Sequence, residues 1–266
     1  MTSRLDAAVA ARGLARSRTH ASQLIADGLV SVDGRPVVKA SAPVADDALI
    51  EVAGADHYVS RAAHKLIAGL DAFAVDVRGR TALDLGASTG GFTQVLLERG
   101  AAPIMAVDVG HGQLSPVIAA DARVRAVEGF NVRYMDAAAL AAATGIDVAP
   151  GIVTGDLSFI SLSHVLGPIV SVAAPAADIV LLVKPQFEVG RTAVRGGLVT
   201  APALRAEALS DILWAAWDLG LRTAGIIASP LPGTHGNREF VVHLSAARGS
   251  DPSEWSDTVD EVAGTR

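Results

Sequence analysis

The sequence reads Asp84-Leu85-Gly86-Ala87-Ser88-Thr89-Gly90-Gly91 between a strand predicted near residues 81–85 and a helix predicted over 91–99. Glycine lets a ligand approach the backbone closely, and the first turn of a helix offers free N–H groups. The stretch has no lysine of the kind found in phosphate-binding loops and does not match the dinucleotide pattern G-x-G-x-x-G. It therefore predicts a strand–turn–helix junction of an α/β protein, serving either as a tight turn alone or as a site for a ligand other than a phosphate.

Strands and helices alternate on both sides of this junction. Strands are predicted near residues 81–85, 103–109, 123–128, 151–156, 178–183, 222–228 and 239–245. Helices are predicted over residues 60–73, 91–99, 162–172 and 202–219. This alternation predicts a doubly wound, mostly parallel sheet of seven strands, an α/β fold. Since no long helix separates the last two strands, we expect them to pair antiparallel.

The N-terminal region differs from the rest in charge and in pattern. Residues 1–40 carry a net charge of +3, whereas the whole chain carries −6. Short helices are predicted over 5–11 and 18–27, and strands over 30–32, 35–38 and 48–52, with a hairpin turn at Asp33-Gly34. We therefore expect a small α+β domain with its linker over residues 1–57, a main domain over 58–248, and an acidic, loosely held tail over 249–266.

The composition excludes several classes of protein. Half of the residues are hydrophobic, which is enough for a buried core, and the chain has no cysteine. Disulfides, thiolate metal sites and a cysteine nucleophile are therefore excluded, and we expect no metal. No apolar run is long enough to span a membrane, and the N-terminus lacks the apolar stretch of a signal peptide, so we expect a cytoplasmic protein that does not act at a membrane.

Lysine is rare in this chain. Lys39, Lys65 and Lys184 are its three lysines among 22 basic residues. Codon bias in a GC-rich genome explains the excess of arginine. The three positions that keep lysine are informative, however, because a lysine can lose its proton in a suitable site and an arginine cannot.

A second acidic residue lies at the expected place for a nucleoside ligand. Asp108 ends the strand predicted over 103–109, 22 residues after Gly86. A carboxylate there can accept hydrogen bonds from both ribose hydroxyls, although it could instead cap a helix. Together with residues 84–91, Asp108 resembles the cofactor motif of S-adenosylmethionine (SAM)-dependent methyltransferases.

Three further polar residues lie at or beside predicted strand ends. Asp156 lies at the end of the fourth strand, Lys184 lies at the end of an apolar strand and precedes a proline, and Glu239 opens the last strand. Ligands in such sheets bind at the carboxyl ends of the strands. A surface position for Lys184 and a solvated position for Glu239 are the alternatives, but a buried lysine needs a partner or a purpose.

Five blocks of the sequence resemble the TlyA (haemolysin A) family of ribosomal RNA ribose 2′-O-methyltransferases. They are SRAAHKL (60–66), DLGASTGGFT (84–93), DLSFISL (156–162), VKPQFEVG (183–190) and SPLPG with GN.E (229–239), and they occur in the family's order. The resemblance covers nearly the whole chain and implies a Rossmann-like SAM-dependent methyltransferase fold preceded by an S4-like RNA-binding domain. The chain departs from the family at His235, where relatives often have serine, and in the loop after Gly190.

The resemblance also implies particular site residues. The four catalytic positions fall on Lys65, Asp156, Lys184 and Glu239. The positions that bind SAM fall on Asp84, Gly86, Ala87, Ser88, Thr89, Gly90, Gly91, Asp108, Asn131 and Asp156. The residues we expect to contact RNA are Arg4, Arg16, Arg18, Lys39, Arg61, Arg133, Phe159 and Arg191. Phe159 would stack on the target base, or else pack in the core, and the basic residues of the head would bind phosphates.

The implied reaction is methylation of the ribose 2′-hydroxyl of cytidine in 16S rRNA, 23S rRNA or both, within ribosomal subunits. Lys184 would act as a general base or stabilise the developing oxyanion, and the sequence leaves both roles open. A small-molecule methyltransferase and a membrane-lytic protein are the alternative interpretations. The RNA-binding head disfavours the former, and the lack of a long amphipathic helix disfavours the latter.

Overall fold

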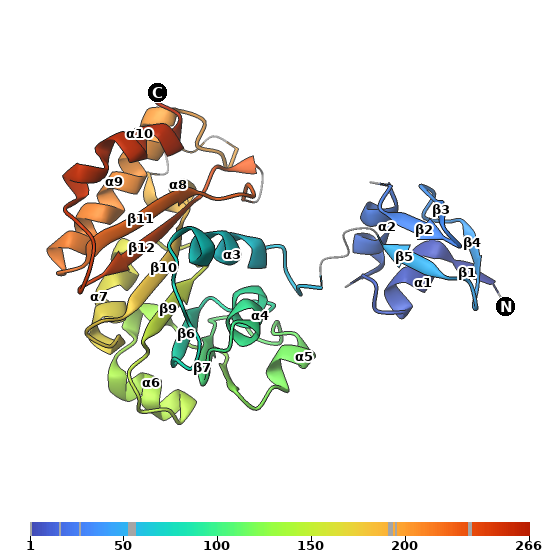
Figure 1. Ribbon diagram of the computed structural model, residues 1–266, viewed down its shortest axis with the longest axis horizontal. Helices are drawn as coiled ribbons and strands as arrows, with labels where there is room; N and C mark the ends of the chain where they lie inside the picture. The colour runs from blue at the N-terminus through green and yellow to red at the C-terminus, as the bar shows by residue number, and fades with distance from the viewer. Residues whose placement is uncertain are drawn as a thin grey trace. The chain divides into compact units, whose positions relative to one another are not determined.

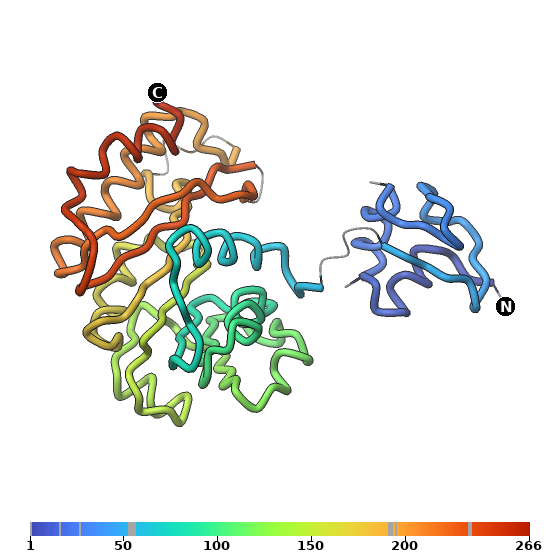
Figure 2. Tube along the Cα trace, viewed as in Figure 1, coloured from blue at the N-terminus to red at the C-terminus, as the bar shows by residue number. Residues whose placement is uncertain are grey.

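The structure is a computed structural model that describes all residues except 1, 16, 27, 53–56, 191–193, 195, 234 and 235 (Figures 1 and 2). Its contacts divide the chain into two compact units, Met1–Val59 and Ser60–Arg266. This division falls two residues after the domain boundary expected from the sequence.

The N-terminal unit is a small α+β fold with its own core. Its elements are β1 (Thr2–Arg4), α1 (Leu5–Ala11), α2 (Arg18–Ala26), β2 (Val30–Val32), β3 (Arg35–Pro36), β4 (Pro43–Ala45) and β5 (Ile50–Val52). β2 pairs antiparallel with both β3 and β5. The β2–β3 turn has positive φ at Asp33 and Gly34, the backbone of a type I′ hairpin, as the Asp-Gly pair predicts. The pairing of β1 with β4 was not predicted.

The C-terminal unit is built on one mixed sheet. Its strands are β6 (Ala82–Leu85), β7 (Ile104–Val107), β8 (Val124–Val127), β9 (Ile152–Gly155), β10 (Asp178–Val183), β11 (Arg222–Ala228) and β12 (Phe240–Ser245). Within the described residues, the strand order is β11-β12-β10-β9-β6-β7-β8. Strands β6 to β10 run parallel, and β12 pairs antiparallel with β10 and β11. The predicted α/β class, mostly parallel sheet and antiparallel final pair are confirmed.

Helices pack on both faces of this sheet (Figure 1). They are α3 (Ala63–Ala72), α4 (Gly91–Glu98), α5 (Pro116–Ala119), α6 (Ala137–Thr144), α7 (Ser163–Val172), α8 (Pro185–Glu188), α9 (Pro202–Asp218) and α10 (Ser256–Ala263), with the short 3-10 turns η1 (Val132–Tyr134) and η4 (Pro252–Trp255). Apolar residues of α7 and α9 join the core of one face with Leu83 and Leu85 of β6. α3 and α4 contact each other beside the other face. This is the three-layer arrangement expected when both faces of a parallel sheet are apolar.

The C-terminal segment is folded, so the expectation of a loosely held tail over residues 249–266 is wrong. Residues 256–263 form α10, whose Val259 and Ala263 are buried in the main core. The buried Arg205 of α9 donates hydrogen bonds to the carbonyl oxygen of Ala263. The segment is acidic on its exposed side, but apolar residues four apart give it a buried stripe that its composition concealed.

The parallel strands bring the sequence motifs to one edge of the sheet. Gly86, Asp108, Asp156 and Lys184 directly follow β6, β7, β9 and β10. These four strands are neighbours in the sheet. Because parallel strands end at the same edge, residues far apart in the sequence meet there.

Candidate functional site

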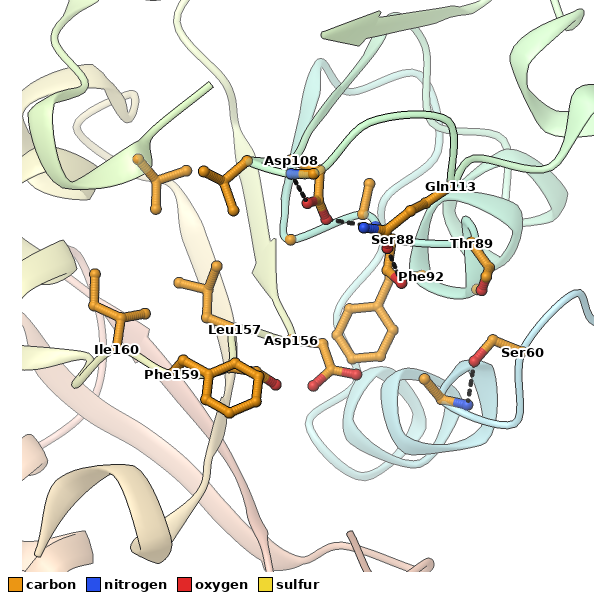
Figure 3. Close-up of a pocket in the computed structure, with 18 of the residues that line it drawn as sticks. Ser60, Ser88, Thr89, Phe92, Asp108, Gln113, Asp156, Leu157, Phe159 and Ile160 are labelled. Atoms are coloured by element: carbon orange, nitrogen blue, oxygen red, sulfur yellow. Dashed lines mark hydrogen bonds between the residues drawn. The ribbon is translucent and has the colours of Figure 1, made fainter. Parts of the chain in front are cut away.

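A cavity of about 670 Å³ opens at this edge of the sheet. Its lining includes the predicted residues Arg61, Lys65, Gly86, Ala87, Ser88, Thr89, Gly91, Asp108, Asn131, Asp156, Phe159, Lys184 and Glu239. Other lining residues were not predicted, among them Ser60, Gln113, Phe130 and Ser158. Figure 3 shows Asp108 joined to Ser88 on one side of the cavity, with Asp156, Leu157 and Phe159 on the other.

The glycine loop holds the Asp108 carboxylate in place. Backbone N–H groups of Ser88 and Gly110 donate to its two oxygens, at 2.8 and 2.7 Å. Ser88 has a positive φ of 47°, and its hydroxyl donates to the Gln113 side chain at 3.1 Å. Each carboxylate oxygen keeps a further lone pair, so Asp108 can still accept hydrogen bonds from a ligand.

Two glycines allow close packing around the cavity. A Cβ at Gly86 would lie 3.1 Å from the backbone oxygen of Asp156, and one at Gly91 would lie 2.8 Å from Ser60 Cβ. Gly86 also has a positive φ of 76°. Any side chain at Gly86 would therefore be strained, and it would push β6 and β9 apart at the edge where the cavity opens.

Asp84 does not line the cavity, contrary to its predicted place among the cofactor-binding residues. Its side chain is fully buried and accepts hydrogen bonds from the hydroxyls of Thr93, at 2.6 Å, and Thr154, at 3.0 Å. Burial raises the pKa of Asp84 to about 6, although the two threonine hydrogen bonds oppose that shift. Asp84 therefore ties α4 to β9 beneath the glycine loop. Gly90 is also outside the lining.

The four predicted catalytic residues all line the cavity and form two ion pairs. Lys65 Nζ lies 2.5 Å from Glu239 Oε2, and both side chains are at most 8% exposed. Lys184 Nζ lies 2.7 Å from Asp156 Oδ1, with the two side chains 10% and 18% exposed. Burial excludes the surface alternatives considered for Lys184 and Glu239. Each buried charge has an opposite charge beside it, which offsets its desolvation.

Lys184 has a second partner, which the sequence does not predict. Its ammonium donates to Ser158 Oγ at 2.8 Å. Lys184 precedes Pro185, the first residue of α8, so its extended backbone ends β10 at the cavity. Ser158 lies between Asp156 and Phe159 in the block 156–162. Its hydroxyl is the sequence feature that could have indicated a role at the site.

Phe159 projects into solvent at the rim of the cavity. Its side chain is 92% exposed, and its φ of 64° is in the left-handed region, which a bulky residue rarely adopts. Its ring centroid lies 5.2 Å from that of Phe187, and Figure 3 shows the ring of Phe159 at the cavity. Core packing, the alternative for Phe159, is therefore wrong.

The other predicted RNA-contacting residues are dispersed. Arg61 lines the cavity, whereas Arg133 is exposed outside its lining. Asn131 lines the cavity and accepts from the backbone of Arg133 through its side-chain oxygen, which leaves the amide group of Asn131 as a donor. Arg16 and Arg191 lie outside the described residues.

In the N-terminal unit, Arg4 and Arg18 share an acidic partner. Their guanidinium groups lie 3.0 and 3.2 Å from Asp6 Oδ2, and both arginine side chains remain more than half exposed. The Arg4 hydrogen bond is the main cause that lowers the pKa of Asp6 to about 2. Lys39 is also exposed. Part of the positive charge expected for phosphate binding is thus neutralised within the unit.

Two classes of feature are absent from the described part of the chain. It contains no group of three or more histidine, cysteine, aspartate or glutamate side chains that could hold a metal ion. None of its helices has the length and apolar character needed to cross a membrane.

Comparisons with known proteins identify both units. The family model described as FtsJ-like methyltransferase matches residues 58–246, and the S4 domain model matches residues 3–50. The 16S/23S rRNA (cytidine-2′-O)-methyltransferase TlyA of Mycobacterium tuberculosis is 48% identical over 91% of this chain and 89% of its own length. Hemolysin A of Brachyspira hyodysenteriae is 35% identical over 91% of this chain and 99% of its own. A solved structure from Streptococcus thermophilus that carries the hemolysin name has a TM-score of 0.76 and 32% identity, covering 99% of this chain and 96% of its own.

Proposed function

Because the chain belongs to the FtsJ-like methyltransferase family and carries an S4 domain, we propose that it methylates the ribose 2′-hydroxyl of cytidine in ribosomal RNA, with SAM as the methyl donor. The substrate is proposed from the activity for which the Mycobacterium tuberculosis relative, 48% identical to this chain, is named. The observation that carries the proposal is the pair of buried Lys–acid contacts beside the glycine loop and an exposed aromatic ring.

The cavity residues suit SAM. Asp108 would accept hydrogen bonds from the ribose hydroxyls of the cofactor, and the loop residues that line the cavity, 86–89 and Gly91, would face its remaining atoms. Asn131 has a free amide donor for an adenine edge. The cofactor supplies an electrophilic methyl group on a positively charged sulfonium. The absence of side chains at Gly86 and Gly91 lets the glycine loop pack closely against Asp156 and Ser60, which also line the cavity.

We assign the chemistry of the acceptor hydroxyl to Lys184. Asp156 and Ser158 hold its Nζ from two directions, which leaves one further position on nitrogen for a substrate oxygen. Lys184 would either take the hydroxyl proton or remain charged and stabilise the oxyanion. Lys65 and Glu239 form a neutral buried pair at the same cavity, where they would shape the electrostatic environment of the reacting groups.

Phe159 and the N-terminal unit would bind the RNA. An exposed ring next to Phe187 is suited to stack on a base that has left its neighbours. The exposed side chains of Arg4, Arg18 and Lys39 would contact phosphates, which gives affinity without sequence specificity.

Methyl transfer to purified ribosomal subunits tests the proposal. The wild type should bind SAM in a calorimetric titration and transfer a labelled methyl group to one or both subunits, and the modified 2′-oxygen should map to a cytidine. Lys184→Ala should bind SAM without transferring methyl groups. SAM binding with no RNA methylation would favour a small-molecule substrate, and cell lysis that persists in Lys184→Ala would favour a lytic activity.

A further inference from the structure

α8 presents one face to the loop formed by residues 156–162. Lys184 precedes the helix, and Phe187 and Glu188 follow at spacings of three and four residues, so the three side chains lie on one side of the turn. Each of them contacts that loop. Lys184 meets Asp156 and Ser158, and Phe187 meets the ring of Phe159.

Glu188 makes the contacts at the far end of the loop. Its Oε2 accepts a hydrogen bond from Ser161 Oγ at 2.5 Å, and its Oε1 accepts one from the backbone N–H of Leu162 at 3.1 Å. Leu162 directly precedes α7 and its side chain makes no capping hydrogen bond, whereas the Ser161 hydroxyl accepts one from the backbone N–H of Ser163 at 3.2 Å. The carboxylate thus stabilises the start of α7, where a negative charge is favourable.

The loop between these two attachments is strained. Phe159 has a positive φ of 64°, which a residue with a side chain adopts only when its surroundings enforce it. Lys184 restrains the loop on one side of Phe159, through Asp156 and Ser158, and Glu188 restrains it on the other. Loss of either attachment would allow the backbone at Phe159 to relax.

We propose that Glu188 is a positioning residue, whose carboxylate holds residues 156–162 so that Phe159 faces the RNA and Ser158 meets Lys184. The proposal rests on the proposed function, because it assigns Phe159 to base stacking. Glu188 itself does not line the cavity. It would act on methyl transfer through the loop and would leave the binding of SAM at Asp108 unaffected.

Glu188→Ala removes both acceptors, and Glu188→Gln keeps one. In the glutamine variant the side-chain oxygen can still accept from the N–H of Leu162, and the side-chain amide can donate to Ser161 Oγ. We expect Glu188→Ala to lower kcat/KM for ribosomal subunits by about tenfold to 100-fold, as misplaced substrate contacts do, while its Kd for SAM stays within about twofold of the wild type. Glu188→Gln should recover most of the lost rate. Glu207→Ala, which removes an exposed glutamate of α9, is the matched control.

Hydrogen exchange of the peptide that spans residues 156–162 gives a second readout that needs no RNA. Exchange should be faster in Glu188→Ala than in the wild type and should be slowed again in Glu188→Gln. If Glu188→Ala does not fold, Ser161→Ala can be measured in its place. This variant removes one donor to the Glu188 carboxylate and should show a smaller effect of the same kind. Unchanged kinetics and exchange in Glu188→Ala, or a parallel loss of SAM binding and methylation, would overturn the proposal. A different result would refute the proposed function instead. In that case the wild type binds SAM and exchanges more slowly than Glu188→Ala at residues 156–162, but it methylates no rRNA.

Discussion

The side chains of Lys65 and Glu239 form a buried ion pair, 2.5 Å from Nζ to Oε2, across a sequence separation of 174 residues. Lys65 comes from α3, near the start of the C-terminal unit, and Glu239 directly precedes β12 near its end. At the cavity, the pair therefore joins the first helix of the C-terminal unit to the strand that comes last in its sequence. Removing one partner leaves the other charge buried without compensation.

The first prediction concerns the stability contributed by this pair. Lys65→Ala and Glu239→Ala should each lower the free energy of unfolding by about 3–5 kcal/mol, because each leaves an uncompensated charge. The double variant should lose clearly less than the sum of the two, since no unpaired charge remains. Urea unfolding of the wild type, the two single variants and the double variant measures the coupling energy between Lys65 and Glu239. Strictly additive losses would contradict a direct interaction.

The second prediction concerns Gly233. A Cβ at this position would overlap the Glu239 carboxylate, so Gly233→Ala must displace this carboxylate from its place beside Lys65. We expect methyl transfer to fall by about tenfold to 100-fold, as it does when a catalytic group is misplaced. Gly167→Ala is the control, since a Cβ there meets no heavy atom within 4 Å. Equal activity of the two variants would show that the position of Glu239 is unimportant.

The third prediction separates the two roles of Lys184. Arginine keeps a positive charge but cannot serve as a base. If Lys184 accepts the hydroxyl proton, Lys184→Arg should lose about 100-fold or more in kcat, the usual contribution of general base catalysis. Single-turnover methyl transfer at saturating SAM measures the loss, and the SAM affinity of the variant controls for an altered cavity. Nearly full activity in Lys184→Arg would leave oxyanion stabilisation as the role of this residue.

The sequence predicted the position of the cavity because each motif follows a parallel strand, and such strands end at one edge. It could not show that Lys184 pairs with Asp156 and Lys65 with Glu239, because pairing depends on how side chains are directed in three dimensions. Ser158 was missed for the same reason.

Two errors have simple physical causes. The family resemblance implies a ligand-binding role for Asp84, but side chains alternate along β6, and Asp84 points away from the core that contains Leu83 and Leu85. The polar composition of residues 249–266 predicts a loosely held tail, but Trp255, Val259 and Ala263 are spaced four residues apart and form a helical face that packs on the main core.

The fourth prediction follows from the buried carboxyl of Asp84. Its pKa is raised from 3.8 to about 6 by burial, so the folded protein keeps a proton between these pH values that the unfolded chain releases. The folded state then binds more protons than the unfolded state, and the free energy of unfolding falls as the pH rises from about 4 to about 6. Above that range both states are ionised and the contribution is constant.

Asp84→Asn removes this titration while its side chain can still bond the hydroxyls of Thr93 and Thr154. The stability difference between wild type and Asp84→Asn should therefore shift by about 2 kcal/mol between pH 4 and pH 7, in favour of the variant at the higher pH. Urea unfolding of both proteins at several pH values gives this difference directly and cancels the titration of other groups. A difference that does not change with pH would mean that Asp84 is ionised in the folded protein throughout this range.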